Sequence, residues 1–151
     1  MNNLYQVLDE LRQFLLLSDY TNTVTFGEIS DVDLGKLTNF PLAHLVIRDA
    51  VIDENTIDFT LDVVAADVVD SSKEYPTDGF LGNTNLQDIL NSQLKVITDV
   101  SNFFRRNDYA SASYITLVDV VRATPFLDRY ENELAGWEAS YTLRTRMQDK
   151  C

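Results

Sequence analysis

Apolar residues recur every three or four positions in two long stretches of the chain, which is the spacing of a helix with one buried face. The first stretch covers residues 3–17 and the second covers residues 86–106. In the first, the apolar positions that share a helical face are Leu4, Val7, Leu8, Leu11, Phe14 and Leu15. The second ends on Arg105 and Arg106, which suit the negative end of a helix dipole. The pattern predicts two amphipathic helices.

Other segments are β-branched or alternate between apolar and polar residues, which is the period of a strand with one buried face. The predicted strands are residues 23–26, 42–52, a run that begins at Ile57, 113–121 and 137–147. The second and third of these are joined by a short polar turn and form a predicted hairpin. The alternation changes phase near Ala65-Ala66, so we expect a bulge or bend there.

Three polar segments, residues 27–39, 71–83 and 123–136, are predicted to be loops, and Pro125 lies in the last of them. The resulting order is helix, three strands, helix, two strands. Two helices packed on one face of a mostly antiparallel sheet satisfy the layer rule for an α+β domain. The length of 151 residues suits a single domain over residues 1–151.

The charge balance narrows the classes of partner. Twelve Lys and Arg stand against 24 Asp and Glu, a formal net charge of -12, so the summed field repels phosphate backbones and anionic membranes. We expect no sequence-specific nucleic-acid binding and no membrane association. The first residues lack the pattern of a secretory signal, and no uncharged apolar stretch of spanning length occurs.

Carboxylates are concentrated in the middle of the chain. Between residues 49 and 78 they are Asp49, Asp53, Glu54, Asp58, Asp62, Asp67, Asp70, Glu74 and Asp78. Asp58 and Asp62 would lie roughly 13 Å apart along a strand, too far to share one ion. The run also lacks the spacing of a calcium-binding loop. Two interpretations stay open: a solvated strand face with its turns, or a negative surface that faces an aqueous lumen or a basic partner.

The residue types that usually carry catalysis are scarce. His44 is the single histidine and lies in an apolar segment, which favours a hydrogen-bonded structural imidazole over a catalytic base. The single cysteine, Cys151, is the last residue and has no evident activating partner. The glycines form no phosphate-binding loop. We therefore expect no enzyme, no cofactor and no metal site.

Several short stretches, together with the order of the predicted elements, resemble a known protein family. The stretches are Pro41-Leu42-Ala43-His44-Leu45, Asp67-Val68-Val69-Asp70, Asn85-Leu86-Gln87-Asp88-Ile89-Leu90, Pro125-Phe126-Leu127-Asp128-Arg129-Tyr130-Glu131-Asn132 and Leu134-Ala135-Gly136-Trp137. They are similar to the tail-terminator and tail-completion proteins of tailed bacteriophages. The resemblance covers most of the chain, and none of the stretches is a catalytic motif.

This resemblance implies a structural virion protein, assembled in the host cytoplasm, that forms a homo-oligomeric ring at the junction of tail and neck. Such a ring caps the tail tube and joins the tail to the head, with tail-tube and neck or portal proteins as neighbours. Six-fold and twelve-fold rings are both open. The alternative is a small acidic adaptor, unrelated to virions, that binds a basic partner.

Two groups of residues are candidates for roles in such a ring. If DNA passes through the lumen, the acidic residues predicted to face it are Asp58, Asp62, Asp67 and Asp70. The predicted contacts between subunits lie in two of the polar segments, because closed rings need two different complementary patches and exposed aromatics are common at interfaces. These residues are Tyr75, Phe80, Phe126, Arg129 and Tyr130. Anchoring of each loop by its own aromatics is the competing interpretation.

Overall fold

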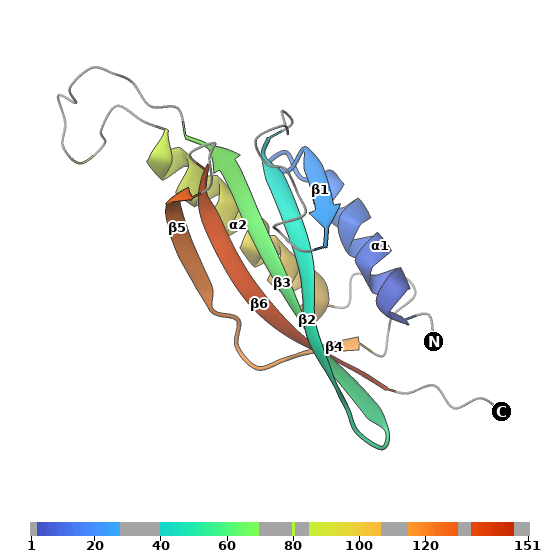
Figure 1. Ribbon diagram of the computed structural model, residues 1–151. Coiled ribbons are helices and arrows are strands. Elements are labelled where there is room, and N and C mark those ends of the chain that lie inside the picture. The colour runs from blue at the N-terminus through green and yellow to red at the C-terminus, as the bar shows by residue number, and fades with distance from the viewer. Residues whose placement is uncertain are drawn as a thin grey trace.

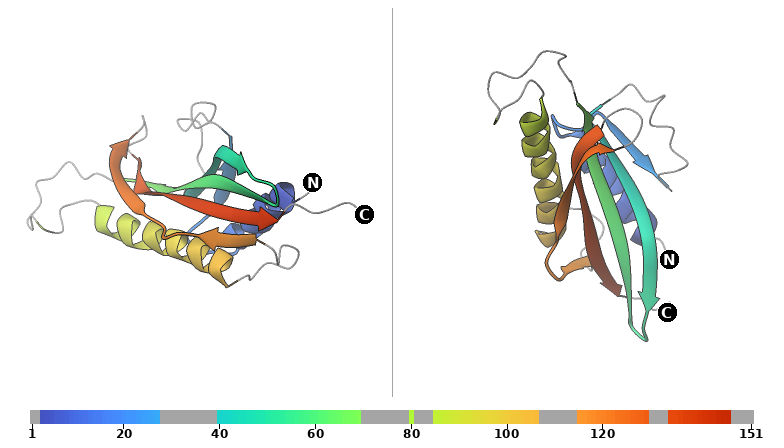
Figure 2. Two further views of the ribbon diagram at one scale, coloured as in Figure 1. Left: turned by 90° about the horizontal axis from the view of Figure 1, so that it is seen from below. Right: turned by 60° about the vertical axis from the view of Figure 1, so that its left-hand side comes forward.

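Two helices cover one face of a six-stranded, mostly antiparallel sheet (Figures 1 and 2), so the predicted α+β class is confirmed. The computed structural model describes residues 3–27, 40–69, 80, 85–106, 115–129 and 134–146. The helices are α1 (Asn3–Leu16) and α2 (Leu86–Arg105). The strands are β1 (Thr23–Phe26), β2 (Leu42–Ile52), β3 (Thr56–Val68), β4 (Ile115–Val118), β5 (Ala123–Arg129) and β6 (Leu134–Arg146).

The sheet has the order β1-β2-β3-β6-β4, with β5 also paired to β6. Strand β1 runs parallel to β2, and every other described pairing is antiparallel. Strands β4 and β5 lie end to end on the same side of β6, because β4 pairs with residues 142–145 and β5 with residues 134–139. The long β2–β3 hairpin and β6 therefore form the centre of the sheet.

The main core lies between the helices and the sheet. The odd-numbered residues of β3 point to this side, since side chains alternate along a strand. The fully buried members from the helices and β3 are Val7, Leu11, Leu15, Val96, Val100, Phe104, Leu61, Val63 and Ala65. One aromatic pair joins the two layers: the ring of Phe104 on α2 lies 6.0 Å from that of Tyr141 on β6 between centroids.

Two hydrogen bonds tie α2 to β6. The indole Nε1 of Trp137 donates to the carbonyl of Leu90 at 2.8 Å, and the Tyr141 hydroxyl donates to the carbonyl of Ile97 at 2.7 Å. Burial raises the pKa of the Tyr141 hydroxyl far above its usual value. Leu90 and Ile97 are about two helical turns apart, so the two bonds fix the position of α2 along the strand.

A second, smaller core lies on the other face of the sheet. It consists of Leu42, Val64, Ala66, Phe126 and Leu134. Val63 and Ala65 are buried on the helix side, while Val64 and Ala66 are buried on this side. The alternation of apolar and polar residues therefore disappears here without any backbone irregularity.

The bulge expected at Ala65-Ala66 is therefore absent. Strand β3 pairs with β6 without interruption from Thr56 to Val68. The register shift lies on β2 instead, between Ile47 and Asp49, which leaves Arg48 as the extra residue.

The prediction of a loop over residues 123–136 is also wrong, because β5 occupies residues 123–129. Its Pro125 is tolerated because β5 pairs only with β6 and lies at the sheet edge, where a missing backbone donor breaks no second ladder. The strand expected at 113–121 is present in a shorter form, as β4.

Candidate functional site

The face of the sheet turned away from α1 and α2 carries a ladder of polar side chains, and we call it the open face. Strand β3 contributes Asp58, Thr60 and Asp62, since even-numbered β3 residues point there. Their partners on β6 in the register are Arg144, Thr142 and Ser140. Cross-strand neighbours on one face are close enough to interact, so this register brings together charges that are far apart in the sequence.

Asp62 is the most buried carboxylate of the ladder, with 8% of its surface exposed. Its Oδ1 accepts a hydrogen bond from Ser140 Oγ at 2.6 Å, and its Oδ2 forms an ion pair with Arg48. Arg48 is the extra residue of the β2 bulge. A buried carboxylate needs such partners, because burial of an unpaired charge is costly.

Asp58 forms a two-pronged ion pair with Arg144, with distances of 2.9 Å from Nε to Oδ1 and 3.0 Å from Nη2 to Oδ2. The hydrogen bonds from Arg144 hold the pKa of the Asp58 carboxyl below its usual value, against a smaller opposing effect of burial. Asp58 and Asp62 therefore lie on one face, as the lumen hypothesis requires. Each is paired with an arginine, so neither is an unpartnered surface charge.

The other two predicted acidic residues differ from these. Asp67 is half-buried and accepts a hydrogen bond from the backbone N–H of Val68 at 2.8 Å. Burial raises the pKa of its carboxyl, and this hydrogen bond opposes the rise only in part. Because side chains alternate along β3, Asp67 points to the opposite face of the sheet from Asp58 and Asp62. Asp70 lies outside the described residues.

A hollow of about 410 Å³ opens on the open face, between the ladder and the segment that joins β4 to β5. Its lining residues are Arg48, Asp62, Asp119, Val120, Arg122, Thr124, Glu138, Ala139, Ser140 and Thr142. Charges of both signs line it, which gives no preference for an anion or a cation. Within the described ranges, no three His, Cys, Asp or Glu side chains are grouped so that they could hold a metal ion.

The imidazole of His44 is buried and both ring nitrogens are engaged. Nε2 donates to the carbonyl of Gly27 at 2.7 Å, and Nδ1 lies 2.6 Å from the hydroxyl of Thr25. These contacts connect β2 to the end of β1. The expectation of a hydrogen-bonded imidazole is confirmed.

The predicted inter-subunit aromatics have different positions. Phe80 is 80% exposed. Phe126 is only 4% exposed and packs in the second core, so its prediction as an exposed contact is wrong. Strand β5, unrecognised in the sequence, turns this ring inward. Arg129 ends β5 and pairs with Leu134, but its side chain lies outside the described part, as do Tyr75 and Tyr130.

The β2–β3 hairpin has an exposed apolar tip, which was not predicted from the sequence. Val51 and Ile52 are 64% and 67% exposed. The hairpin runs past the ends of both helices and of β4 (Figures 1 and 2). The available signal was the apolar sequence Ala50-Val51-Ile52 directly before the acidic turn at Asp53, because three apolar residues in a row do not fit a strand with one buried face.

A second apolar surface lies between α1 and β1. This groove of about 430 Å³ is lined by Tyr5, Leu8, Asp9, Arg12, Val24, Thr25, Phe26 and Leu45. Tyr5 and Phe26 are among the most exposed aromatics of the described chain.

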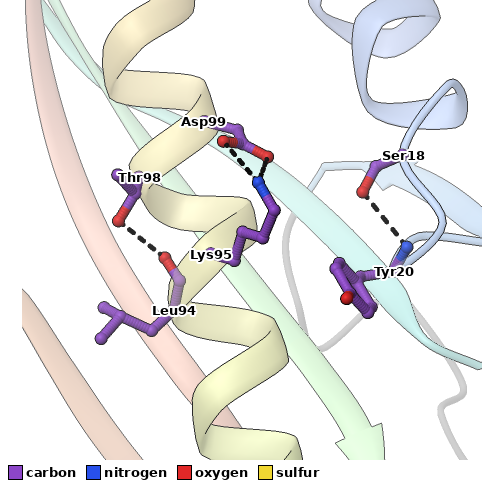
Figure 3. A network of polar contacts seen from close by, with 6 residues as sticks. All are labelled: Ser18, Tyr20, Leu94, Lys95, Thr98 and Asp99. Carbon is purple, nitrogen blue, oxygen red and sulfur yellow. Dashed lines mark hydrogen bonds and ion pairs between the residues drawn. The ribbon is translucent and has the colours of Figure 1, made fainter.

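The outer surface of α2 carries ordinary helix-surface contacts (Figure 3). Lys95 pairs with Asp99 one turn later at 3.2 Å, and the Thr98 hydroxyl donates to the carbonyl of Leu94 at 2.9 Å. Exposed pairs of this kind contribute little to stability. The hollow beside them, of about 300 Å³, has Lys95 and Asp99 in its wall.

No protein-family model matches the chain, and comparison with curated proteins finds no significant relative. In the described part of the chain, neither helix is long and apolar enough to cross a membrane.

Proposed function

We propose that this chain is a structural virion protein of a tailed bacteriophage that forms a homo-oligomeric ring at the junction of tail and neck. There it caps the tail tube and joins the tail to the head. The proposal starts from the sequence resemblance. The order helix, three strands, helix, strand that the resemblance implies is also the order of the first six elements of the fold.

The observation that carries the proposal is the projecting β2–β3 hairpin with its apolar tip. The hairpin extends beyond the helix layer (Figure 1), and Val51 and Ile52 near its turn are largely exposed. An isolated monomer gains no stability from apolar side chains held in water on a projecting arm. Burial of the tip against another chain provides that gain, so the arm favours a protein that functions in an assembly.

The charges of the open face suit a surface that borders a DNA passage. Arg48 and Arg144 form no positive patch, because each is paired with an aspartate, Asp62 or Asp58. The chain as a whole is strongly acidic. A DNA backbone would be weakly repelled there, so the genome could move through the lumen without binding. Tail-tube and neck or portal proteins are the proposed neighbours above and below the ring.

The test is the mass of the native assembly, measured by analytical ultracentrifugation and native mass spectrometry. We expect a closed species of six or twelve copies, either alone or after addition of the tail-tube protein proposed as its neighbour. A chain that stays monomeric in both conditions, from micromolar to millimolar concentration, would refute the ring and favour the acidic adaptor. Portal, tail-tube or capsid genes on either side of the coding sequence would support the virion assignment independently.

A further inference from the structure

The arm and the groove are two different apolar surfaces on one chain. The arm is the hairpin tip, residues 49–55, and the groove is the α1–β1 hollow described above. A chain with two unlike complementary patches can assemble head to tail, because each copy offers one patch to each neighbour.

The arm cannot reach the groove of its own chain. Leu45 lies in the groove wall, and Ile52 is seven residues further along the same strand. At the rise of an extended strand, this separation is roughly 23 Å. The strand is also held in its ladder with β3, from the pair Leu45↔Val63 to the pair Ile52↔Ile57, with one bulge at Arg48, so it cannot fold back on itself. An arm that docks in the groove must therefore belong to another chain.

The groove is the described hollow that best suits an aliphatic tip. The hollow on the open face is lined mainly by charged and hydroxyl groups, and the one beside α2 contains the Lys95–Asp99 pair. The groove instead presents Tyr5, Leu8 and Phe26. Contact between these surfaces and Val51 and Ile52 would remove apolar area from water on both partners.

The groove carries charges of both signs, and its cation can pair with the acidic arm. The arm carries Asp49, Asp53 and Glu54 and no basic residue. The groove contains Arg12, which forms no ion pair with any described residue, while its one carboxylate, Asp9, accepts a hydrogen bond from Gln13 at 3.0 Å. Opposite charges at the rim of an interface set the orientation of docking and discourage wrong partners.

Addition of a strand from another chain to the unpaired edge of β2 is less favourable than insertion of side chains into the groove. Strand β1 covers β2 only from Leu42 to Leu45, so the outer side of the following residues lacks a described neighbour. The bulge at Arg48 interrupts the regular spacing there, a device that protects edge strands from adding another strand. Side-chain insertion is consistent with that bulge.

We propose that the arm of one copy docks in the groove of the next, with Val51 and Ile52 against Tyr5, Leu8 and Phe26, and with Arg12 facing the acidic turn. The occupant is a second copy of this chain. This inference rests on the proposed ring and specifies its interface.

The test is disulfide cross-linking between two single-cysteine variants. Both carry Cys151→Ser; one adds Ile52→Cys and the other adds Phe26→Cys. Mixed under mild oxidation, they should yield a cross-linked heterodimer in at least tenfold excess over either homodimer. The matched control replaces Phe26→Cys with Val120→Cys, an exposed residue on the opposite side of the sheet. The side chains replaced by cysteine, those of Ile52, Phe26 and Val120, are exposed, so thermal melts should match the parent.

Three outcomes decide the matter. The expected heterodimer supports the arm and groove. An oligomer of the correct mass without it, or with equal cross-linking to Val120→Cys, overturns the interface and leaves the ring intact. A chain that is monomeric with and without the tail-tube protein overturns both.

In addition, Arg12→Glu should raise the concentration for half-assembly at least tenfold, and Glu54→Arg in the same chain should recover part of this loss. An unchanged concentration in Arg12→Glu contradicts the docking geometry.

Discussion

Replacement of Gly136 by alanine should destabilise the sheet through one steric conflict. Gly136 lies in β6 opposite Ala66 of β3, where the two strands pass close together. A Cβ added at residue 136 would lie 1.9 Å from the carbonyl oxygen of Ala65 and 2.9 Å from its carbonyl carbon. Ordinary van der Waals contact begins near 3.4 Å, and neither backbone atom can rotate away. The two central strands would have to separate locally.

The size of the effect follows from that required movement. Overpacking in a well-packed interior costs about 1–3 kcal/mol, and a clash with backbone belongs at the upper end of this range. For a domain of this length, a loss of about 3 kcal/mol lowers the melting temperature by roughly 6–12 °C. Thermal unfolding followed by far-ultraviolet circular dichroism measures this shift.

Gly27→Ala is the matched control. Gly27 has a positive φ, of 118°, but a Cβ there would meet nothing within 4 Å. This variant bears only the backbone strain, about 1 kcal/mol, and should lose roughly 2–4 °C. Equal losses in the two variants, or a Gly136→Ala protein as stable as the parent, would show that the close approach of β3 and β6 does not limit residue 136.

Three further predictions concern titration and packing. Burial raises the pKa of the Asp67 carboxyl. The contribution of this group to the stability of the fold is therefore complete below the unfolded pKa of about 3.9 and is lost as pH rises. Asp67→Asn should raise the melting temperature at pH 7 and have no effect near pH 2. The pKa of the Asp58 carboxyl is lowered, so its ion pair with Arg144 stabilises the fold above about pH 4, and this stabilisation is lost as pH falls. Asp58→Asn should lower the melting temperature slightly at pH 7 and leave it unchanged near pH 2. Tyr141→Phe removes the hydrogen bond to the Ile97 carbonyl and should cost about 1 kcal/mol in urea unfolding, whereas Tyr141→Ala should cost about 3–5 kcal/mol because it also leaves a cavity.

Regular periodicity made the helices and β3 predictable from the sequence, whereas β2 was predicted from an apolar, β-branched run. The helices and β3 each have one face in the main core, so their apolar residues repeat at the spacing of the element. Around Val64 and Ala66 both faces of β3 are buried, which produces an apolar run that imitates a bulge. The β5 strand was hidden because Pro125 suggests a turn, and its place at the sheet edge depends on β6, which follows it in the chain.

The candidate surfaces were less accessible to sequence reasoning than the elements. The acidic run was evident, but the pairing of two of its members, Asp62 with Arg48 and Asp58 with Arg144, depends on the cross-strand register, which no local pattern encodes. Exposure of Ile52 likewise depends on how far the hairpin extends beyond the helices. The buried position of Phe126 depends on a second core that forms only after β5 folds against β6.

The hydrogen bond from Trp137 to the Leu90 carbonyl gives the protein an internal optical reporter. Trp137 is the single tryptophan of the chain, so its indole emission comes from one place, the contact between α2 and β6. If α2 separated from the sheet, the indole would enter water and its emission would shift to longer wavelength, whatever happened at the hairpin tip. Fluorescence can thus follow the integrity of the subunit body while an independent measurement follows assembly.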